Sequence, residues 1–285
     1  MDVVVPTALR EASEFAEELV FAEEQARRAG QLLVDSYERV LHIDRKSKRD
    51  VVTEVDYASE RLILDAIRER YPRDAVLAEE SGHHQRHGPD GRASGRTWVI
   101  DPLDGTVNYA NGIPYFCVSI GLVRDDRPVV GVVLDPLRDD CFTATVDGAA
   151  RLSGERITAS DKESMADFVV SLAIIGRGGI GRERRIGREI RIPRRMGSAA
   201  LSLAYVGSGR FDAYVQNGGL SLWDVAAAGL IAERGGATVS DLQGGPWWNS
   251  SRRSARVSIV AAPPRQHAEL LSLLAASGTT VRSRR

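Results

Sequence analysis

Residues 98–108 read Trp-Val-Ile-Asp-Pro-Leu-Asp-Gly-Thr-Val-Asn. The apolar run that opens this stretch is typical of a buried strand, and Pro102 disfavours a regular ladder or helix directly after it. Two carboxylates, Asp101 and Asp104, therefore leave the end of one strand together. Because neighbouring carboxylates repel each other, this arrangement is costly unless cations lie between them. Divalent cations with oxygen ligands, chiefly Mg²⁺, are the natural neutralisers.

The turn that follows Asp104 favours binding of an anion. If a helix begins here, the backbone amides of Gly105 and Thr106 are free to point at a negatively charged group. Carboxylates for a metal ion beside an anion-binding turn are the components of a metal-assisted phosphatase. The stretch therefore predicts both a fold feature, a strand ending in a metal site, and a chemistry.

The composition of the whole chain limits the alternatives. With 285 residues and a formal net charge of −1, the chain can bury a large core and has no global basic excess. Nucleic-acid binding is therefore not expected. The N-terminus has no signal-peptide pattern, and no apolar run is long enough to cross a bilayer. The two cysteines, Cys117 and Cys141, lie in apolar surroundings and are expected to be reduced core residues. These features predict a cytoplasmic protein.

The first half of the chain has an α+β pattern. Helical spacing of apolar residues predicts a helix within 7–40 and a second one from about Asp56 to Arg70. A polar loop is expected from Asp44 to Asp50, followed by a short extended piece at 51–56. Residues 82–96 are expected to be an exposed loop. Apolar runs between turn signals predict the strands 75–78, 97–101, 115–123, 128–135 and 140–145, which make a mostly antiparallel sheet.

The second half begins near residue 148, so the expected division is 1–147, with metal-binding motifs, and 148–285, with segments that determine substrate specificity. Predicted strands cover 168–175, 211–215 and 256–262, and predicted helices cover 198–206, 222–233 and 264–275. Residues 176–195 are dense in glycine and arginine with little apolar periodicity. They are expected to form an exposed loop; the alternative is an arginine lid that contacts a second anionic group of a substrate.

Two further acidic residues, Asp224 and Glu79, are candidate metal ligands beside Asp101 and Asp104. Asp224 follows Trp223 at the start of an apolar helix, where on its own it would be interpreted as an N-cap. Glu79 ends a strand, and on its own it would be a solvated loop acid. All four acids stand at strand ends or helix starts, where active sites gather. Two Mg²⁺ ions need about this many oxygen ligands.

Several motifs together resemble the inositol monophosphatase family, which belongs to the lithium-sensitive, magnesium-dependent phosphatases. The motifs are residues 101–108, residues 223–229 (Trp-Asp-Val-Ala-Ala-Ala-Gly), Glu79-Glu80-Ser81, residues 52–56, residues 197–201 and Gly235-Gly236. The resemblance covers most of the chain. It implies an α+β fold layered as an αβαβα sandwich, as in the inositol monophosphatases and fructose bisphosphatases, and a homodimer.

The resemblance also implies roles for individual residues. Glu79, Asp101 and the Leu103 carbonyl would hold a first Mg²⁺, while Asp101, Asp104 and Asp224 would hold a second; Glu79 would also reach a third, weaker ion. Asp56 and Thr106 would form the dyad that takes a proton from a metal-bound water, with Glu79 as a further catalytic residue. The amides of Gly105 and Thr106 would hold the phosphate. The substrate-binding positions would be Ser198, Ala199, Gln216 and Asn217, and Lys46 would lie in a mobile loop.

The substrate stays open at this point. The family usually has an acidic residue a few positions before Trp-Asp, and here the region reads Gln216-Asn217-Gly218-Gly219-Leu220. An amide can bond a substrate hydroxyl, but without assistance from charge. We expect a Mg²⁺-dependent phosphomonoesterase acting on a small polyol or sugar phosphate. The alternatives are a phosphatase for histidinol phosphate, a fructose bisphosphate or adenosine 3′,5′-bisphosphate, and a regulatory binding protein that keeps the fold.

Overall fold

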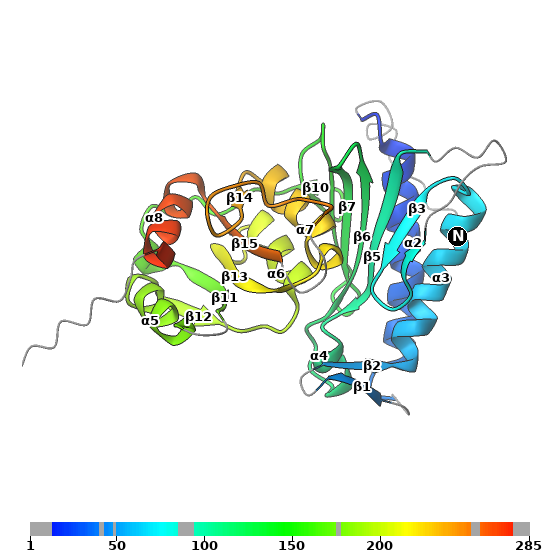
Figure 1. The fold of residues 1–285 in the computed structure, drawn as a ribbon, viewed down its shortest axis with the longest axis horizontal. Helices are drawn as coiled ribbons and strands as arrows, with labels where there is room; N and C mark the ends of the chain where they lie inside the picture. Colours follow the sequence, from blue (N-terminus) through cyan, green and yellow to red (C-terminus); the bar gives the residue numbers. More distant parts are fainter. Residues whose placement is uncertain are drawn as a thin grey trace, which may run out of the picture.

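The computed structural model describes residues 13–39, 43–47, 50–84, 94–174, 178–251 and 257–275. Two mixed β-sheets alternate with three layers of helices, as Figure 1 shows from one side of the molecule to the other. The predicted αβαβα sandwich is therefore confirmed. Among the described residues, no helix is both long and apolar enough to cross a membrane.

The larger sheet has eight strands, and it carries the first motif. Its order is β10-β9-β8-β7-β6-β5-β3-β4, and only the β3–β5 pair is parallel. The strands are β3 (Ala75–Ala78), β4 (Gly82–His84), β5 (Arg96–Asp104), β6 (Cys117–Arg124), β7 (Arg127–Asp135), β8 (Asp140–Thr145), β9 (Arg151–Leu152) and β10 (Glu155–Arg156). The register of β5 against β6 shifts between Asp101 and Asp104, where Pro102 interrupts the ladder.

Two long helices, α2 (Ala16–Ser36) and α3 (Glu54–Arg70), cover one face of this sheet. The buried residues of α2 recur every three or four positions, for example Ala22, Ala26, Ala29 and Leu33. Helix α3 begins with a capping box in which Thr53 and Asp56 bond each other's backbone amides. The cap makes α3 start at Glu54, two residues before the expected position.

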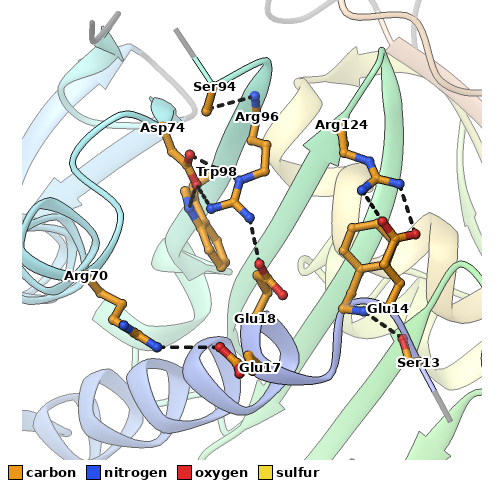
Figure 2. Close-up of polar contacts among 11 residues, drawn as sticks. Ser13, Glu14, Glu17, Glu18, Arg70, Asp74, Ser94, Arg96, Trp98 and Arg124 are labelled. Carbon is orange, nitrogen blue, oxygen red and sulfur yellow. Dashed lines mark hydrogen bonds and ion pairs between the residues drawn. The ribbon is translucent and has the colours of Figure 1, made fainter. Parts of the chain in front are cut away.

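Polar contacts hold α2 against the large sheet, as Figure 2 shows. Arg96 on β5 donates to Glu18 of α2 at 2.6 Å and to the buried carboxylate of Asp74. The same carboxylate accepts a hydrogen bond from Trp98 Nε1 at 3.0 Å. The buried Asp74 carboxylate is hydrogen-bonded to both Arg96 and Trp98, so it holds the Arg96 side chain in place. Arg96 in turn fixes the position of α2 through Glu18.

Helices α6 (Ala199–Gly207) and α7 (Leu222–Arg234) form the middle layer, between the two sheets. Helix α7 approaches the large sheet closely, because Gly121 on β6 and Gly131 on β7 carry no side chain. A Cβ at Gly131 would lie 2.6 Å from the Ala227 carbonyl oxygen. This close packing places the first turn of α7 beside the end of β5.

The smaller sheet has the order β12-β11-β13-β15-β14. Its strands are β11 (Val169–Ala173), β12 (Ile192–Arg194), β13 (Ala213–Leu220), β14 (Thr238–Ser240) and β15 (Val257–Ala262). Strands β11, β12 and β13 run parallel to one another, and β15 is antiparallel to β13 and β14. Helices α5 (Gly179–Glu189) and α8 (Pro264–Ala275) cover its outer face.

Three expectations about irregular segments were wrong. Residues 179–189 of the expected arginine-rich loop form helix α5, which buries Ile186 and is followed directly by the buried Ile190. Within the expected polar loop at 44–50, β1 (Ile43–Ser47) pairs with β2 (Asp50–Thr53) as a hairpin. In the expected loop at 82–96, Gly82–His84 pair with β3 as β4, while residues 85–93 lie outside the described residues.

Candidate metal centre

Three carboxylates meet where β5 ends and α7 begins. One oxygen from each of Asp101, Asp104 and Asp224 lies within 4.8 Å of the others. Asp101 and Asp104 belong to the irregular end of β5, and Asp224 lies in the first turn of α7. Asp224 also closes the capping box of α7, because one of its oxygens accepts a hydrogen bond from the Ser221 amide at 2.6 Å. The acids that stood far apart in sequence are therefore neighbours.

Glu79 adds a fourth carboxylate to this cluster. Its backbone amide bonds the Ile100 carbonyl at 3.2 Å and so continues the parallel β3–β5 ladder by one residue. This pairing sets Glu79 close enough to Asp101 for its charge to raise the pKa of the Asp101 carboxyl. Two carboxylates this close repel each other in the metal-free chain.

Burial and mutual repulsion disfavour the ionised form of the acids in this cluster. Burial raises the pKa of Asp101 well above 3.8, and the charges of Glu79, Asp104 and Asp224 raise it further. Burial also raises the pKa of Asp224, with Asp104 the next contributor. Oxygen donors packed together at this cost fit a hard divalent cation, which would replace the repulsion by attraction. The donor set of the chain thus agrees with the expected metal.

Asp104 has a second set of partners at the N-terminus of α6. Its Oδ2 accepts hydrogen bonds from Ser198 Oγ at 2.6 Å and from the Ala200 amide at 2.7 Å. Burial raises the pKa of Asp104, and these donors work in the opposite direction. Ser198 is the N-cap of α6 and bonds the Leu201 amide as well. Asp104 therefore ties the middle helical layer to the acid cluster.

Asp56 and Thr106 are in contact although 50 residues separate them. Thr106 Oγ1 lies 3.0 Å from Asp56 Oδ1 and 3.0 Å from the Leu103 carbonyl oxygen. A hydroxyl has one hydrogen, so Thr106 can donate to only one of these acceptors at a time. The other oxygen of Asp56 accepts from the Thr53 amide at 2.9 Å and the Thr53 hydroxyl at 2.5 Å. These contacts fix the orientation of the buried Asp56 carboxylate.

The turn between β5 and the short helix α4 (Thr106–Ala110) depends on Gly105. Its φ of 99° lies in the left-handed region, which residues with a side chain rarely adopt. A Cβ there would also lie 3.1 Å from the Tyr115 carbonyl oxygen and 3.2 Å from Phe116. Glycine therefore allows the chain to turn sharply enough for Thr106 to face Asp56.

A cavity of about 360 Å³ opens beside the acid cluster and extends toward the smaller sheet. Tyr214 and Gln216 on β13 form part of its wall. The Tyr214 hydroxyl donates to Gln216 Oε1, and Gln216 Nε2 donates to the Gly218 carbonyl at 3.1 Å. Arg195 lies at the exposed side of the cavity and forms an ion pair with Glu183 of α5. The cavity thus has an acidic end and a wall of neutral polar groups.

The structure gathers most of the residues that the sequence singled out. Around the acids and the cavity lie Asp56, Glu79, Asp101, Leu103, Asp104, Gly105, Thr106, Ser198, Ala199, Gln216 and Asp224. Asn217, the next residue on β13, is not among the cavity-lining residues. Lys46 lies in β1 rather than in a loop, and its side chain is outside the description.

Two residues of this region were not predicted from the sequence: Thr53 orients Asp56, and Tyr214 orients Gln216. Arg195, which lines the cavity, lies in the segment 176–195 for which an arginine lid was the alternative. Thr53 had a readable signal, because threonine three residues before an acid at a helix start is a capping box. Tyr214 and Gln216 share one face of β13, but no motif in the sequence marks a hydrogen bond between them.

A partly buried cluster of acids between two mixed sheets, beside a cavity with polar groups in its wall, supplies the oxygen donors that a divalent metal ion would need. The chain belongs to the inositol monophosphatase family, whose model matches residues 15–279. It is 40% identical over 235 residues to the Nus factor SuhB of Pseudomonas aeruginosa, covering 77% of this chain and 83% of that protein.

Two solved structures have the same fold. The extragenic suppressor protein SuhB of Bartonella henselae superposes with a TM-score of 0.83 at 31% identity, covering 92% of this chain and 99% of that one. The IMPase of Thermotoga maritima superposes with a TM-score of 0.80 at 30% identity, covering 90% of this chain and 96% of that one. Relatives of this chain thus carry both phosphatase and Nus factor names.

Proposed function

We propose that the protein is a Mg²⁺-dependent phosphomonoesterase that acts on a small polyol or sugar phosphate. The observation that carries the proposal is the convergence of Asp101, Asp104 and Asp224 within 4.8 Å, beside a cavity of about 360 Å³. Membership of the inositol monophosphatase family supports the same reaction. A cavity of this size suits a single sugar or polyol ring carrying one phosphate.

The acids divide into two overlapping sets of ligands in this proposal. Glu79, Asp101 and the Leu103 carbonyl would hold one Mg²⁺, and Asp101, Asp104 and Asp224 would hold another; Glu79 would also contact a third, weaker ion. Bound Mg²⁺ supplies acidification of a coordinated water and neutralisation of phosphate charge. The contribution of the Glu79 charge to the raised pKa of Asp101 supports the first set, because it requires the two side chains to lie near each other.

The proton in this reaction would pass to the Asp56–Thr106 pair. Thr106 Oγ1 would accept a hydrogen bond from the attacking water while donating its own hydrogen to Asp56 Oδ1, the 3.0 Å contact already formed. Asp56 is fully buried, and its other oxygen is occupied by Thr53. One oxygen of the carboxylate is therefore directed to Thr106 and the water. The amides of Gly105 and Thr106 would bind the phosphate oxygens, as the turn before α4 suggests.

Substrate recognition would fall to the wall of the cavity. Gln216 uses its Oε1 for Tyr214 and one Nε2 hydrogen for Gly218, so one lone pair and one hydrogen remain for substrate hydroxyls. A neutral amide discriminates hydroxyl groups less strongly than a carboxylate does. This favours a broader range of polyol and sugar phosphates than an acidic residue at position 216 would.

A phosphate-release screen tests the proposed function. The purified chain would be assayed with Mg²⁺ against inositol, sugar, histidinol, fructose bisphosphate and adenosine bisphosphate substrates, with and without lithium. We expect release from a polyol or sugar phosphate that depends on Mg²⁺ and is inhibited by lithium. Preference for histidinol phosphate or a bisphosphate would keep the chemistry and change the substrate. No release from any of them would refute the proposal.

The Nus factor relatives support a second proposal, that the chain also binds the transcription apparatus. Such a role needs a surface rather than turnover. An Asp101→Asn variant, expected to be inactive as a phosphatase, should then still co-purify with RNA polymerase from its host to the same extent as the wild type. If neither protein co-purifies with the polymerase, the binding role is contradicted and the phosphatase proposal is unaffected.

A further inference from the structure

Helix α3 presents three buried polar residues toward the candidate metal centre. Of these, Asp56 belongs to the proposed Asp56–Thr106 pair, and the other two lie outside the proposed mechanism. Asp56, Ser59 and Glu60 are at spacings that place them on one face of the helix. All three are at most 3% exposed. Buried polar side chains are costly unless they are hydrogen-bonded, so the partners of Ser59 and Glu60 indicate what they do.

The Glu60 carboxylate bonds the turn that follows Glu79. Its Oε2 accepts from the Glu80 amide at 2.8 Å, and its Oε1 accepts from the Ser81 amide at 2.9 Å. Glu79 itself is attached on its other side by the 3.2 Å bond to the Ile100 carbonyl. The backbone of this expected metal ligand is thus held between the end of β3 and a charged acceptor on α3.

Ser59 performs the matching task for the second loop. Its hydroxyl donates to the Pro102 carbonyl at 2.9 Å. Pro102 has no amide hydrogen and lies in the interruption of the β5–β6 ladder, so its carbonyl depends on a side chain for a partner. The bond from Ser59 therefore fixes the segment that carries Asp101 and Leu103.

The negative charge of Glu60 indicates that this residue has a specific role. Glu60 adds a carboxylate beside a cluster that already repels negative charge, and a neutral residue would avoid that addition. A carboxylate is the side chain that can accept from two adjacent amides at once, and bonds to a charged acceptor are stronger than neutral ones. The contacts of Glu60 thus account for a charge that would otherwise only weaken the fold.

We propose that Glu60, assisted by Ser59, is a positioning residue that sets the separation between Glu79 and Asp101 and thereby the Mg²⁺ affinity of the first site. One face of helix α3 would then fix the segment that carries Glu79, the segment that carries Asp101, and the Asp56–Thr106 pair. The inference rests on the metal centre of the proposed function, and it does not depend on which phosphate ester is hydrolysed. Glu60 touches neither substrate nor metal in this account.

Glu60→Gln is the central variant, because it keeps the size of the side chain and replaces one acceptor with a donor that faces an amide. Binding of Mn²⁺ to substrate-free protein, followed by electron paramagnetic resonance, and the Mg²⁺ concentration for half-maximal activity would be measured. We expect both to show affinity weakened roughly 10- to 100-fold, the range for residues that orient metal ligands. Turnover at saturating Mg²⁺ should stay within about 3-fold of wild type, because a positioning defect is overcome by excess metal.

The matched control is Glu69→Gln, which removes one charge from the exposed face of the same helix and should leave Mn²⁺ binding unchanged. Ser59→Ala is a milder second variant, expected to weaken Mn²⁺ binding about 3- to 10-fold, below the range for Glu60. It also covers the case in which Glu60→Gln fails to fold.

Wild-type protein that binds Mn²⁺, with Glu60→Gln or Ser59→Ala folded and unchanged in affinity, would overturn the inference. A drop in turnover at every Mg²⁺ concentration, without a change in Mn²⁺ affinity, would also overturn it, since a general structural defect predicts that pattern. Wild-type protein that binds Mn²⁺ and hydrolyses no phosphate ester would instead contradict the proposed function and leave the positioning role intact.

Discussion

At the scale of single residues, the acid cluster is a place where function opposes stability. Burial and three neighbouring carboxylates raise the pKa of Asp101, so the folded metal-free chain is strained at neutral pH. A group whose folded pKa is raised stabilises the fold below its unfolded value, near 3.8, and loses that contribution as pH rises through the folded pKa. In the metal-free chain the cluster therefore lowers stability at neutral pH, and bound cations would offset this loss.

The Asp101→Asn variant should separate the effect of this carboxylate on activity from its effect on stability. Removing a shared metal ligand should lower phosphate release at least about 100-fold, because metal ions contribute several kcal/mol of transition-state stabilisation. The same change removes a repelled charge, so the metal-free variant should unfold at a higher temperature than metal-free wild type at pH 7. Calorimetry and a phosphate assay check both effects, with exposed Asp161→Asn as the control. A lower unfolding temperature would show that the charge is not strained.

Stabilisation by Mg²⁺ should depend on pH in a defined direction. The raised pKa values of Asp101, Asp104 and Asp224 mean that protons compete with the metal as pH falls. At pH 8, Mg²⁺ at about 100 times its dissociation constant should stabilise the fold by about 2.7 kcal/mol. At pH 5 the same concentration should have much less effect. Equal shifts in the unfolding temperature at both values would contradict the assignment of the ligands.

At the scale of secondary-structure elements, the predictions succeeded where a signal is local. Helix α7 has a long apolar run and ends one residue after its predicted end, and α8 covers the predicted residues 264–275. Helix α5 was missed because Ile186 is the one large apolar side chain that it buries, among many charged residues. Strands of two or three residues, such as β9 and β14, were missed because so short a segment carries no alternation of apolar and polar residues that could be recognised.

The middle helical layer depends on missing side chains in the large sheet. Gly131→Ala would place a Cβ 2.6 Å from the backbone oxygen of Ala227 on α7, so the helix must shift. We expect a loss of about 1–3 kcal/mol in the free energy of unfolding. Gly187→Ala, in α5 with open space around it, should stabilise by up to about 1 kcal/mol. Chemical denaturation measures both, and equal effects would contradict this account of the packing.

Helix α8 is attached to the smaller sheet through a buried histidine. His267 Nε2 lies 2.8 Å from Ser240 Oγ on β14, and burial lowers the pKa of His267 below 6.5. A lowered folded pKa means that this stabilisation is complete above 6.5 and is lost as pH falls through the window below it. His267→Gln, which does not titrate, should lack this component. Denaturation of both proteins from pH 8 to pH 5 should show the difference shrinking; a constant difference would rule it out.

At the scale of the whole molecule, the order of the layers creates the site. The chain supplies Glu79 and Asp101 from the large sheet, Asp224 from the middle helices and Gln216 from the smaller sheet. The sequence indicated the acids, because each stands at the end of an element. It could not indicate the contacts between layers, such as Asp104 with Ser198 or Ser119 with the Trp223 carbonyl, since these depend on tertiary packing. The homodimer that the resemblance implies stays a prediction.

The central claim is that this assembly of layers binds divalent metal through Asp101, Asp104 and Asp224. Anomalous diffraction from crystals soaked in Mn²⁺ tests it most directly, because Mn²⁺ replaces Mg²⁺ at oxygen ligands and is visible by its own scattering. We predict at least one strong anomalous peak in contact with oxygens of all three carboxylates. If crystals soaked in saturating Mn²⁺ show the three side chains turned apart and no anomalous peak among them, the account is contradicted.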